Sequence, residues 1–372
     1  MKLVMTLLAR DEADIVDAQI AFHLHAGVDL VIATDNRSED GTTEILERYE
    51  REDVLQLIRE PGDDLRQSEW VTRMARLAAT EHGADWVLNA DADEFWWPPG
   101  SGLKDVLAAV PERYGVVRAA WRNFVPRPMD ADFFAERMTV RLCTPAFHHH
   151  PLSTHWKSAH RGAHDVRIGR GNHEAFGEGL LPLRGWYPFE ILHFPVRSLE
   201  QCVRKYVTQF VALERNAEKG IPNHMADAYE AWRAGRLEAF YAPLVVGDDE
   251  LERGLESGRF AHDVRLRDVL RGLDFGHGQN GRASPPVPDT FSTRPLSDAV
   301  SAPPGVRHRG SEFGRPDVAA AAQYAAESTA LDESDLALAL GARMDELEGR
   351  VGVLERGALS RVRGAVARAR RS

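Results

Sequence analysis

The chain has 372 residues, 43% of them hydrophobic and 28% charged, which is enough to bury a sizeable core. Its net charge of -11 argues against a general nucleic-acid binder, because acidic surfaces repel a phosphate backbone. Two cysteines, Cys143 and Cys202, are too few for a disulfide framework and suit a reducing cytoplasm. No apolar run approaches the ~20 residues that cross a bilayer, and the opening run 3–8 is too short for a signal peptide. We therefore expect a cytoplasmic protein.

Short apolar runs alternate with helix-like segments over the first ninety residues. Strands are expected at 2–8, 30–34, 54–58 and 86–88, and helices at 15–26, 43–50 and 69–82. This order predicts an α/β fold with parallel strands covered by helices. Ligands of such sheets bind at the carboxyl ends of the strands.

Polar residues follow three of these strands and should share one rim of the sheet: Arg10, Asp11, Glu12, Asp35, Asn36, Asp91 and Asp93. Two simpler interpretations remain: Asp11 caps the following helix, and residues 38–42 form only a turn that leads into a helix. For Asp35 we favour a functional role, since a carboxylate directly after an apolar run can accept a hydrogen bond from a base or ribose.

Asp91 and Asp93 are the strongest candidates for a metal site. Side chains two apart on a strand point to one side, so the two carboxylates could converge on Mg²⁺ or Mn²⁺. Such an ion would neutralise a departing nucleoside diphosphate. The alternative is a solvated acidic turn.

Three segments, 7–14, 34–42 and 91–95, resemble the nucleotide-sugar glycosyltransferases of family 2 with a GT-A fold, especially the subgroup related to family 92. The resemblance continues through Lys157, 171–173 and 191–201 to about residue 270. It implies a mostly parallel, Rossmann-like sheet flanked by helices. It also implies that the first two segments line the nucleotide pocket, with Arg10, Glu12 and Asp35, and that Asp91 and Asp93 hold ribose, metal and diphosphate.

Basic residues and histidines supply further candidates. Lys157 could place an ammonium against the diphosphate, or simply be solvated. Eight of the fifteen histidines lie between residues 148 and 193, but their spacing fits no zinc pattern. His193, and after it His173, could complete the cation site; the alternative for His193 is a buried, hydrogen-bonded ring.

An inverting enzyme also needs a base for the acceptor hydroxyl. Our candidates are His173 and Glu174, with Glu178 and Glu190 left open. Glu94 would anchor its loop or touch the acceptor. Trp96 and Trp97 would stack on a sugar or pack in the core.

The C-terminal quarter differs in character. Residues 275–330 form a linker, rich in Gly, Pro and Ser at its start, that we expect to be disordered. Residues 331–372 combine an amphipathic pattern with a tail of five arginines. That pattern predicts either a coiled coil that makes a homo-oligomer or a helix packed on its own domain. The basic tail would contact anionic lipid at the inner face of a membrane, or remain solvated.

The sequence as a whole predicts a GT-A domain over 1–274, with a nucleotide half (1–97) and an acceptor half (98–274). The expected activity is metal-dependent transfer from a nucleotide sugar, UDP-sugar first, to a polysaccharide or glycoconjugate. A metal-dependent phosphoesterase and a non-catalytic nucleotide-sugar binding scaffold are the alternatives.

Overall fold

The computed structural model describes residues 1–62, 64–98, 102–128, 133–143, 156–183, 187–214 and 223–273. The predicted linker and the amphipathic helix with its basic tail lie outside these ranges, so their predictions remain untested. Among the described residues, no helix is long and apolar enough to cross a membrane.

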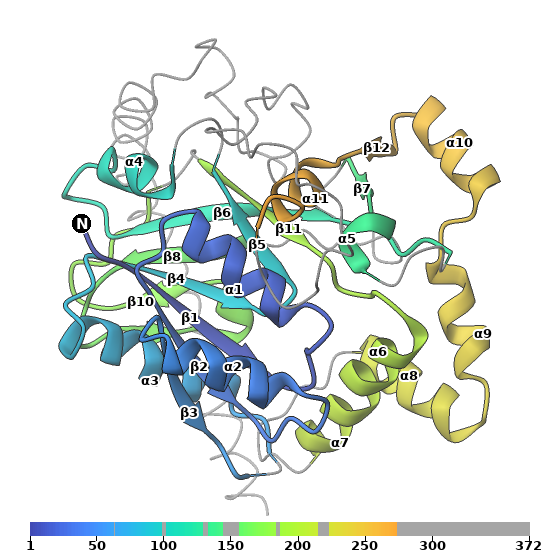
Figure 1. The fold of residues 1–372 in the computed structure, drawn as a ribbon, viewed down its shortest axis with the longest axis horizontal. Coiled ribbons are helices and arrows are strands. Elements are labelled where there is room, and N and C mark those ends of the chain that lie inside the picture. Colours follow the sequence, from blue (N-terminus) through green and yellow to red (C-terminus); the bar gives the residue numbers. More distant parts are fainter. Residues whose placement is uncertain are drawn as a thin grey trace, which may run out of the picture.

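A central sheet organises the described part of the chain (Figure 1). Its strands are β1 (Leu3–Ala9), β2 (Leu30–Asp35), β3 (Leu55–Arg59), β4 (Trp86–Asp91), β5 (Glu94–Trp97), β6 (Val116–Asn123), β8 (Trp156–Arg161) and β11 (Phe189–His193). They are ordered β3-β2-β1-β4-β8-β6-β11-β5. Four of the seven neighbouring pairs are parallel: β3 with β2, β2 with β1, β1 with β4, and β6 with β11. The predicted α/β class with a mostly parallel sheet is confirmed.

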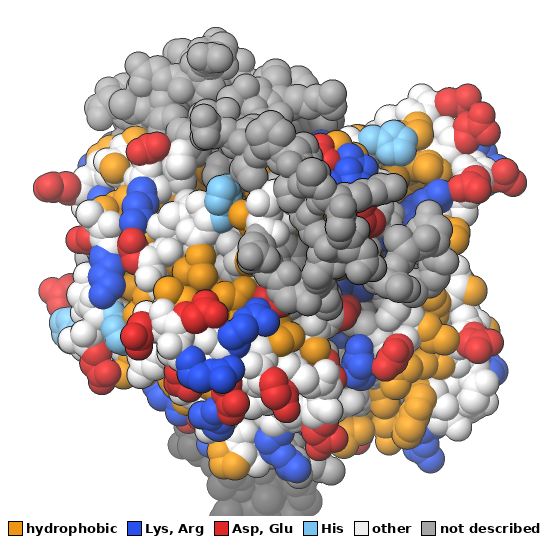
Figure 2. All heavy atoms as spheres, viewed as in Figure 1, with side chains coloured by type: hydrophobic (Ala, Val, Ile, Leu, Met, Phe, Trp, Pro, Cys, Tyr) orange, Lys and Arg blue, Asp and Glu red, His pale blue; other side chains and the backbone are white. Residues whose placement is uncertain are grey.

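Helices cover both faces of this sheet. Successive side chains of β1 point to opposite faces and pack against different helices. Leu3, Met5 and Leu7 pack into one apolar cluster with residues of α1 (Val16–His25) and α2 (Thr42–Arg51). Val4 faces the other way, into a cluster with α3 (Gln67–Thr80). Side chains of both charge signs lie over the outer surface of α2 in Figure 2. Helix α2 therefore buries one face and leaves the other in water, whereas α1 is almost entirely buried.

Shorter elements extend this core. They are α4 (Leu103–Ala108), α5 (Phe134–Arg137), β7 (Val140–Leu142), β9 (Arg167–Ile168), η1 (Arg170–Asn172), β10 (Ala175–Phe176), α6 (Leu199–Cys202), η2 (Val203–Thr208), α7 (Gln209–Glu214), α8 (Asn223–Arg233), α9 (Leu237–Tyr241), η3 (Ala242–Leu244), α10 (Asp248–Glu256), β12 (Phe260–His262) and α11 (Arg265–Leu270). Two small antiparallel pairs, β9 with β10 and β7 with β12, stand apart from the main sheet.

A network of buried ion pairs connects strands β6 and β11 to helix α11. Glu190 on β11 pairs with Arg122 on β6 and, at 2.8 Å, with Arg265 of α11. Burial alone would raise the pKa of Glu190, but the two guanidinium groups outweigh it and lower the pKa to about 2. Glu190, one of the candidate bases, is therefore a poor proton acceptor at neutral pH and serves the fold instead.

This network predicts a pH dependence of stability. Because the pKa of Glu190 is lower in the folded state than its ordinary 4.5, its contribution is complete above that value and is lost as the pH falls towards 2. The shift corresponds to on the order of 3 kcal/mol. Glu190→Gln should therefore lower the free energy of unfolding at pH 6 by much more than at pH 3, measured by urea denaturation. Glu200→Gln, at a side chain 79% exposed, is the control and should change little at either pH; an equal loss for Glu190→Gln at both would contradict the prediction.

Candidate functional site

The carboxyl ends of β1, β2 and β4 lie side by side, as the parallel order requires. The register places Ala9 opposite Asp35 and Leu8 opposite Asp91. The residues that follow these strands therefore meet at one edge of the sheet, which we call the rim. The predicted gathering of the three polar segments is present in the structure.

Hydrogen bonds connect the loop after β1 to the loop after β2. Asp11 has a left-handed backbone, with φ of 55°. Its backbone N–H donates to Ser38 Oγ at 3.0 Å, and its Oδ1 accepts from the N–H of Glu39 at 2.8 Å. Helix α1 starts later, after Ile15, with no side-chain cap. The capping interpretation of Asp11 is therefore wrong, and its carboxylate instead holds two rim loops together.

Asp35 organises the loop that it begins. Its carboxylate accepts hydrogen bonds from the backbone and hydroxyl of Ser38 and from the hydroxyl of Thr43. Next to it, Arg10 donates to Asn36 Oδ1 at 3.2 Å. The turn at 38–42 leads into α2 as expected, because Asp40 accepts from the Thr42 N–H that opens this helix.

Asp91 and Asp93 do not lie on one strand, which corrects the prediction from side-chain alternation. β4 ends at Asp91, the chain turns at Ala92 and Asp93, and β5 starts at Glu94. Glu94 closes this turn, since its Oε2 accepts the N–H of Asp91 at 3.1 Å. Glu94 is thus a loop anchor, one of its two predicted roles.

Lys157 reaches this turn from β8 and is fully buried. Its Nζ lies 2.6 Å from Asp91 Oδ2 and 3.0 Å from Glu94 Oε1. Burial opposes its charge, but the two carboxyl groups outweigh this and raise the pKa of Lys157. Burial also raises the pKa of Glu94 to about 8, despite Lys157. The solvated alternative for Lys157 is wrong.

The other side of Asp91 faces the loop that precedes β10. Its Oδ1 accepts from Asn172 at 3.1 Å and from Gln67 at 3.3 Å. Asn172 is fully buried and has a left-handed backbone, with φ of 60°. The predicted segment 171–173 is therefore brought to the rim.

Asp93 has different partners. Lys205, from η2, pairs with its Oδ2, and His193 Nε2 lies 3.5 Å from the same oxygen. Burial would raise the pKa of Asp93, but Lys205 and His193 hold it well below its ordinary range. His193 is buried, stacks on Trp121 at 4.3 Å and faces Asn123 through Nδ1 at 2.6 Å. His193 is thus a buried, hydrogen-bonded ring, and its predicted role as a ligand of the cation stays a prediction.

The three predicted metal ligands do not form one cluster. Asp93 and His193 adjoin, whereas the nearest cation to Asp91 is Lys157. In the part of the chain that the structure describes, no group of three His, Cys, Asp or Glu side chains could hold a metal ion. Asp91 and Asp93 instead each face a lysine ammonium group, an arrangement that does not fit Mn²⁺ or Mg²⁺ unless the lysines move, and the individual ligand assignments stay predictions.

Arg197, which follows β11, forms ion pairs with two carboxyl groups of the loop after β1. Its guanidinium pairs with Glu12, contacts Asp14 Oδ2 at 2.7 Å and donates to the Phe194 carbonyl at 3.1 Å. Burial raises the pKa of Glu12 to about 7, with Arg197 opposing the rise. For Asp14, burial is outweighed by Arg197, which lowers its pKa. Sequence reasoning assigned no role to Arg197 or Lys205.

The two proposed bases have different surroundings. His173 Nδ1 lies 2.6 Å from the Trp156 carbonyl, and its ring meets Trp121 edge-on at 5.9 Å. Both carboxylate oxygens of Glu174 accept hydrogen bonds from Arg118 Nη2, at 2.9 and 2.8 Å. His173 directly follows Asn172, and it shares an aromatic neighbour, Trp121, with His193.

The remaining candidate residues lie away from the rim. Trp96 and Trp97 are fully buried, which confirms core packing over sugar stacking. His160 is buried, and burial lowers its pKa to about 4. Glu178 is exposed. The cluster 148–150 and His155 lie outside the described residues.

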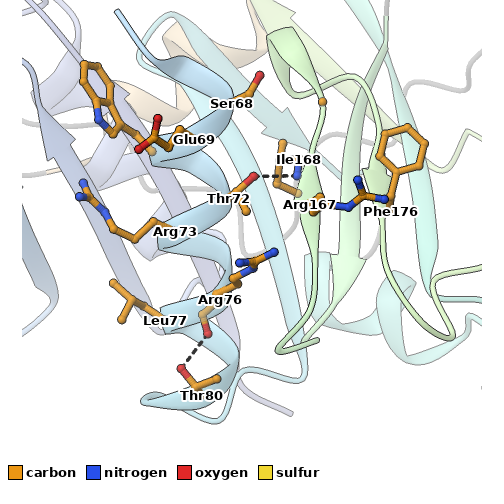
Figure 3. Close-up of a pocket in the computed structure, with 12 residues that line it drawn as sticks. Ser68, Glu69, Thr72, Arg73, Arg76, Leu77, Thr80, Arg167, Ile168 and Phe176 are labelled. Atoms are coloured by element: carbon orange, nitrogen blue, oxygen red, sulfur yellow. Dashed lines mark hydrogen bonds between the residues drawn. The ribbon is translucent and has the colours of Figure 1, made fainter.

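A groove of about 700 Å³ lies between α3 and the β9–β10 pair (Figure 3). Thr72 accepts the Ile168 N–H across it, and Arg73, Arg76 and the exposed Phe176 line it. None of the predicted site residues lines this groove, so we place the candidate site at the rim.

Comparison with known proteins gives only distant similarity. No family model matches, and no curated protein matches. A structure of S. aureus TarS 1-349 in complex with UDP is 14% identical, over 65% of this chain and 72% of that one, with a TM-score of 0.30. Glucosyl-3-phosphoglycerate synthase from Mycobacterium tuberculosis, in complex with Mn²⁺, UDP and glucosyl-3-phosphoglycerate, is 18% identical over 32% of this chain and 44% of that one, with a TM-score of 0.24. In two further TarS structures the match spans only 23% and 36% of those chains, with TM-scores of 0.23 and 0.25.

The Arg197 link predicts a large effect on stability. Arg197→Met would leave Glu12 and Asp14 without their cation, and breaking a buried pair in this way costs about 3–5 kcal/mol. We expect a loss of that size in the free energy of unfolding at pH 7, measured by urea denaturation. Arg59→Met is the control: Arg59 pairs with Glu47, and their side chains are 53% and 44% exposed, so its loss should cost under about 1 kcal/mol. Equal losses for the two variants would refute the role of Arg197.

Proposed function

We propose that this protein is a nucleotide-sugar glycosyltransferase of the GT-A type. The donor is a nucleoside diphosphate sugar, UDP-sugar in the first place, and the acceptor is a polysaccharide or glycoconjugate. The observation that carries this proposal is the rim itself. The three segments that resemble the transferases meet at the carboxyl ends of β1, β2 and β4, and two lysine ammonium groups contact carboxylates of the third segment.

The first two rim loops suit the nucleoside half of the donor. Arg10 and Asn36 lie in contact beside Asp35, and Asp11 fixes the distance between the loops. Asp35 accepts three hydrogen bonds of its own loop, and a carboxylate has about four acceptor positions. The carboxylate is thus held in place with capacity left for a ribose or base donor, which supports its predicted role.

The turn at 91–94 suits the diphosphate half. A departing diphosphate needs positive charge held where negative charge develops, and prearranged groups supply it without reorganisation. Lys157 and Lys205 bring such charge to Asp91 and Asp93. The described residues do not fit a divalent cation, so no step of this proposal passes through one.

His173 is the better of the two proposed bases. Its Nδ1 faces a carbonyl oxygen, to which it must donate, so Nε2 carries the lone pair in the neutral ring. That is the state in which imidazole accepts a proton from an acceptor hydroxyl. A Cβ at Gly171 would lie 2.5 Å from Nε2, so this glycine leaves room for the ring. Glu174 is held by Arg118, which makes it a weaker base.

The setting of the enzyme belongs to the same proposal. We expect a cytoplasmic protein that contacts the inner face of a membrane through its basic tail and self-associates through residues 331–372. Measuring the mass of the full chain by light scattering tests the second point.

A binding experiment tests the proposed donor class. In calorimetric titrations with UDP, GDP, CDP and dTDP, we expect one nucleotide, UDP first, to bind. Asp35→Asn removes a carboxylate acceptor from the nucleoside pocket and should weaken that binding about tenfold, the effect of one charged hydrogen bond. Asp248→Asn, at a side chain 90% exposed, is the control. Absence of binding by all four nucleotides, both in EDTA and in Mn²⁺, would overturn the proposed function.

A further inference from the structure

Lys205 occupies the position at Asp93 where the sequence predicts a metal ion. Its ammonium pairs with Asp93 Oδ2, and the Asp93 side chain is only 3% exposed. Lys205 lies on η2, a six-residue π-helical turn between α6 and α7. Such π-helical turns are rare and often occur at functional sites.

The second carboxylate of the pair has its own ammonium. Lys157 comes from β8, on the other side of the turn, and contacts Asp91 and Glu94. Asp91 and Asp93 are thus each neutralised by a lysine, from two elements far apart in the sequence. A divalent ion that bridged the two carboxylates would have to displace both ammonium groups.

Lys205 keeps a donor for a ligand. An ammonium has three N–H groups. Among the described residues, Lys205 uses one on Asp93 and one, at 3.4 Å, on the Pro195 carbonyl. Its side chain is 17% exposed, whereas that of Lys157 is 1% exposed. Lys205 is therefore the lysine that a phosphate group can reach directly.

We propose that Lys205, held in place by Asp93, neutralises the donor diphosphate together with the buried Lys157, so that nucleotide binding requires no divalent cation. This inference rests on the proposed function. Lysine binds phosphate as a point charge, and the charge works best where water is partly excluded. Asp93 is then a positioning residue for Lys205 rather than a metal ligand.

The test is a titration of the full chain with UDP, GDP, CDP and dTDP, each in EDTA and in Mn²⁺. We expect one nucleotide to bind with dissociation constants that agree within about threefold in the two conditions. Lys205→Met should weaken its binding in EDTA by about tenfold or more. Lys104→Met is the matched control, because Lys104 forms a lysine–aspartate pair of 2.6 Å with Asp29, at the opposite end of β1.

Two further measurements separate binding from folding. Lys205→Met should leave binding of the matching nucleoside, which has no phosphate, unchanged within about threefold, whereas a merely structural role would weaken both ligands. If Lys205→Met does not fold because Asp93 is left unpaired, the double variant Asp93→Asn with Lys205→Met removes both charges and should show the same selective loss. Lys205→Arg should retain most of the binding.

The outcomes distinguish the two proposals. Nucleotide binding only in Mn²⁺, or equal binding by Lys205→Met, would overturn the role of Lys205 and leave the transferase proposal standing. Absence of binding by all four nucleotides in both conditions would overturn both.

Discussion

The pairing of buried charges where the strands end is the constraint on which the site depends. Five carboxyl groups of the rim, Glu12, Asp14, Asp91, Asp93 and Glu94, are matched by three cations, Arg197, Lys157 and Lys205. An unpaired charge at such depth costs several kcal/mol. The loops that carry these groups are therefore held in one arrangement, because any other leaves a charge alone.

This constraint links the sheet to the helices beyond it. Arg197 joins the end of β11 to the loop after β1, and Lys205 joins η2 to the turn after β4. Elements that share no strand pairing are thus fixed relative to one another by ion pairs. A site built in this way is arranged before its ligand arrives, which is the condition under which fixed charges stabilise a developing negative charge most effectively.

The first half of the fold could be predicted from the sequence because its signals are local. Apolar runs and intervening helices gave β1 to β4, and the rim residues followed from the rule for parallel sheets. The strand end at Asp91 could not be fixed, since such boundaries are uncertain by a few residues. The partners of the rim carboxylates were also hidden: Lys205 lies 112 residues from Asp93, and Arg197 lies 183 residues from Asp14. Pairs at such separations leave no periodic pattern.

The rim also carries less negative charge than its acidic sequence suggests. Burial raises the pKa of Glu94 to about 8 and that of Glu12 to about 7, so near neutral pH both carry protons for much of the time. Protonation of these two glutamates removes part of the negative charge that the sequence of the rim suggests. In the proposed binding mode, a diphosphate would compete with Asp91 and Asp93 for the ammonium groups of Lys157 and Lys205. Burial of the two glutamates therefore makes the proposed binding of an anion compatible with the acidic sequence of the rim.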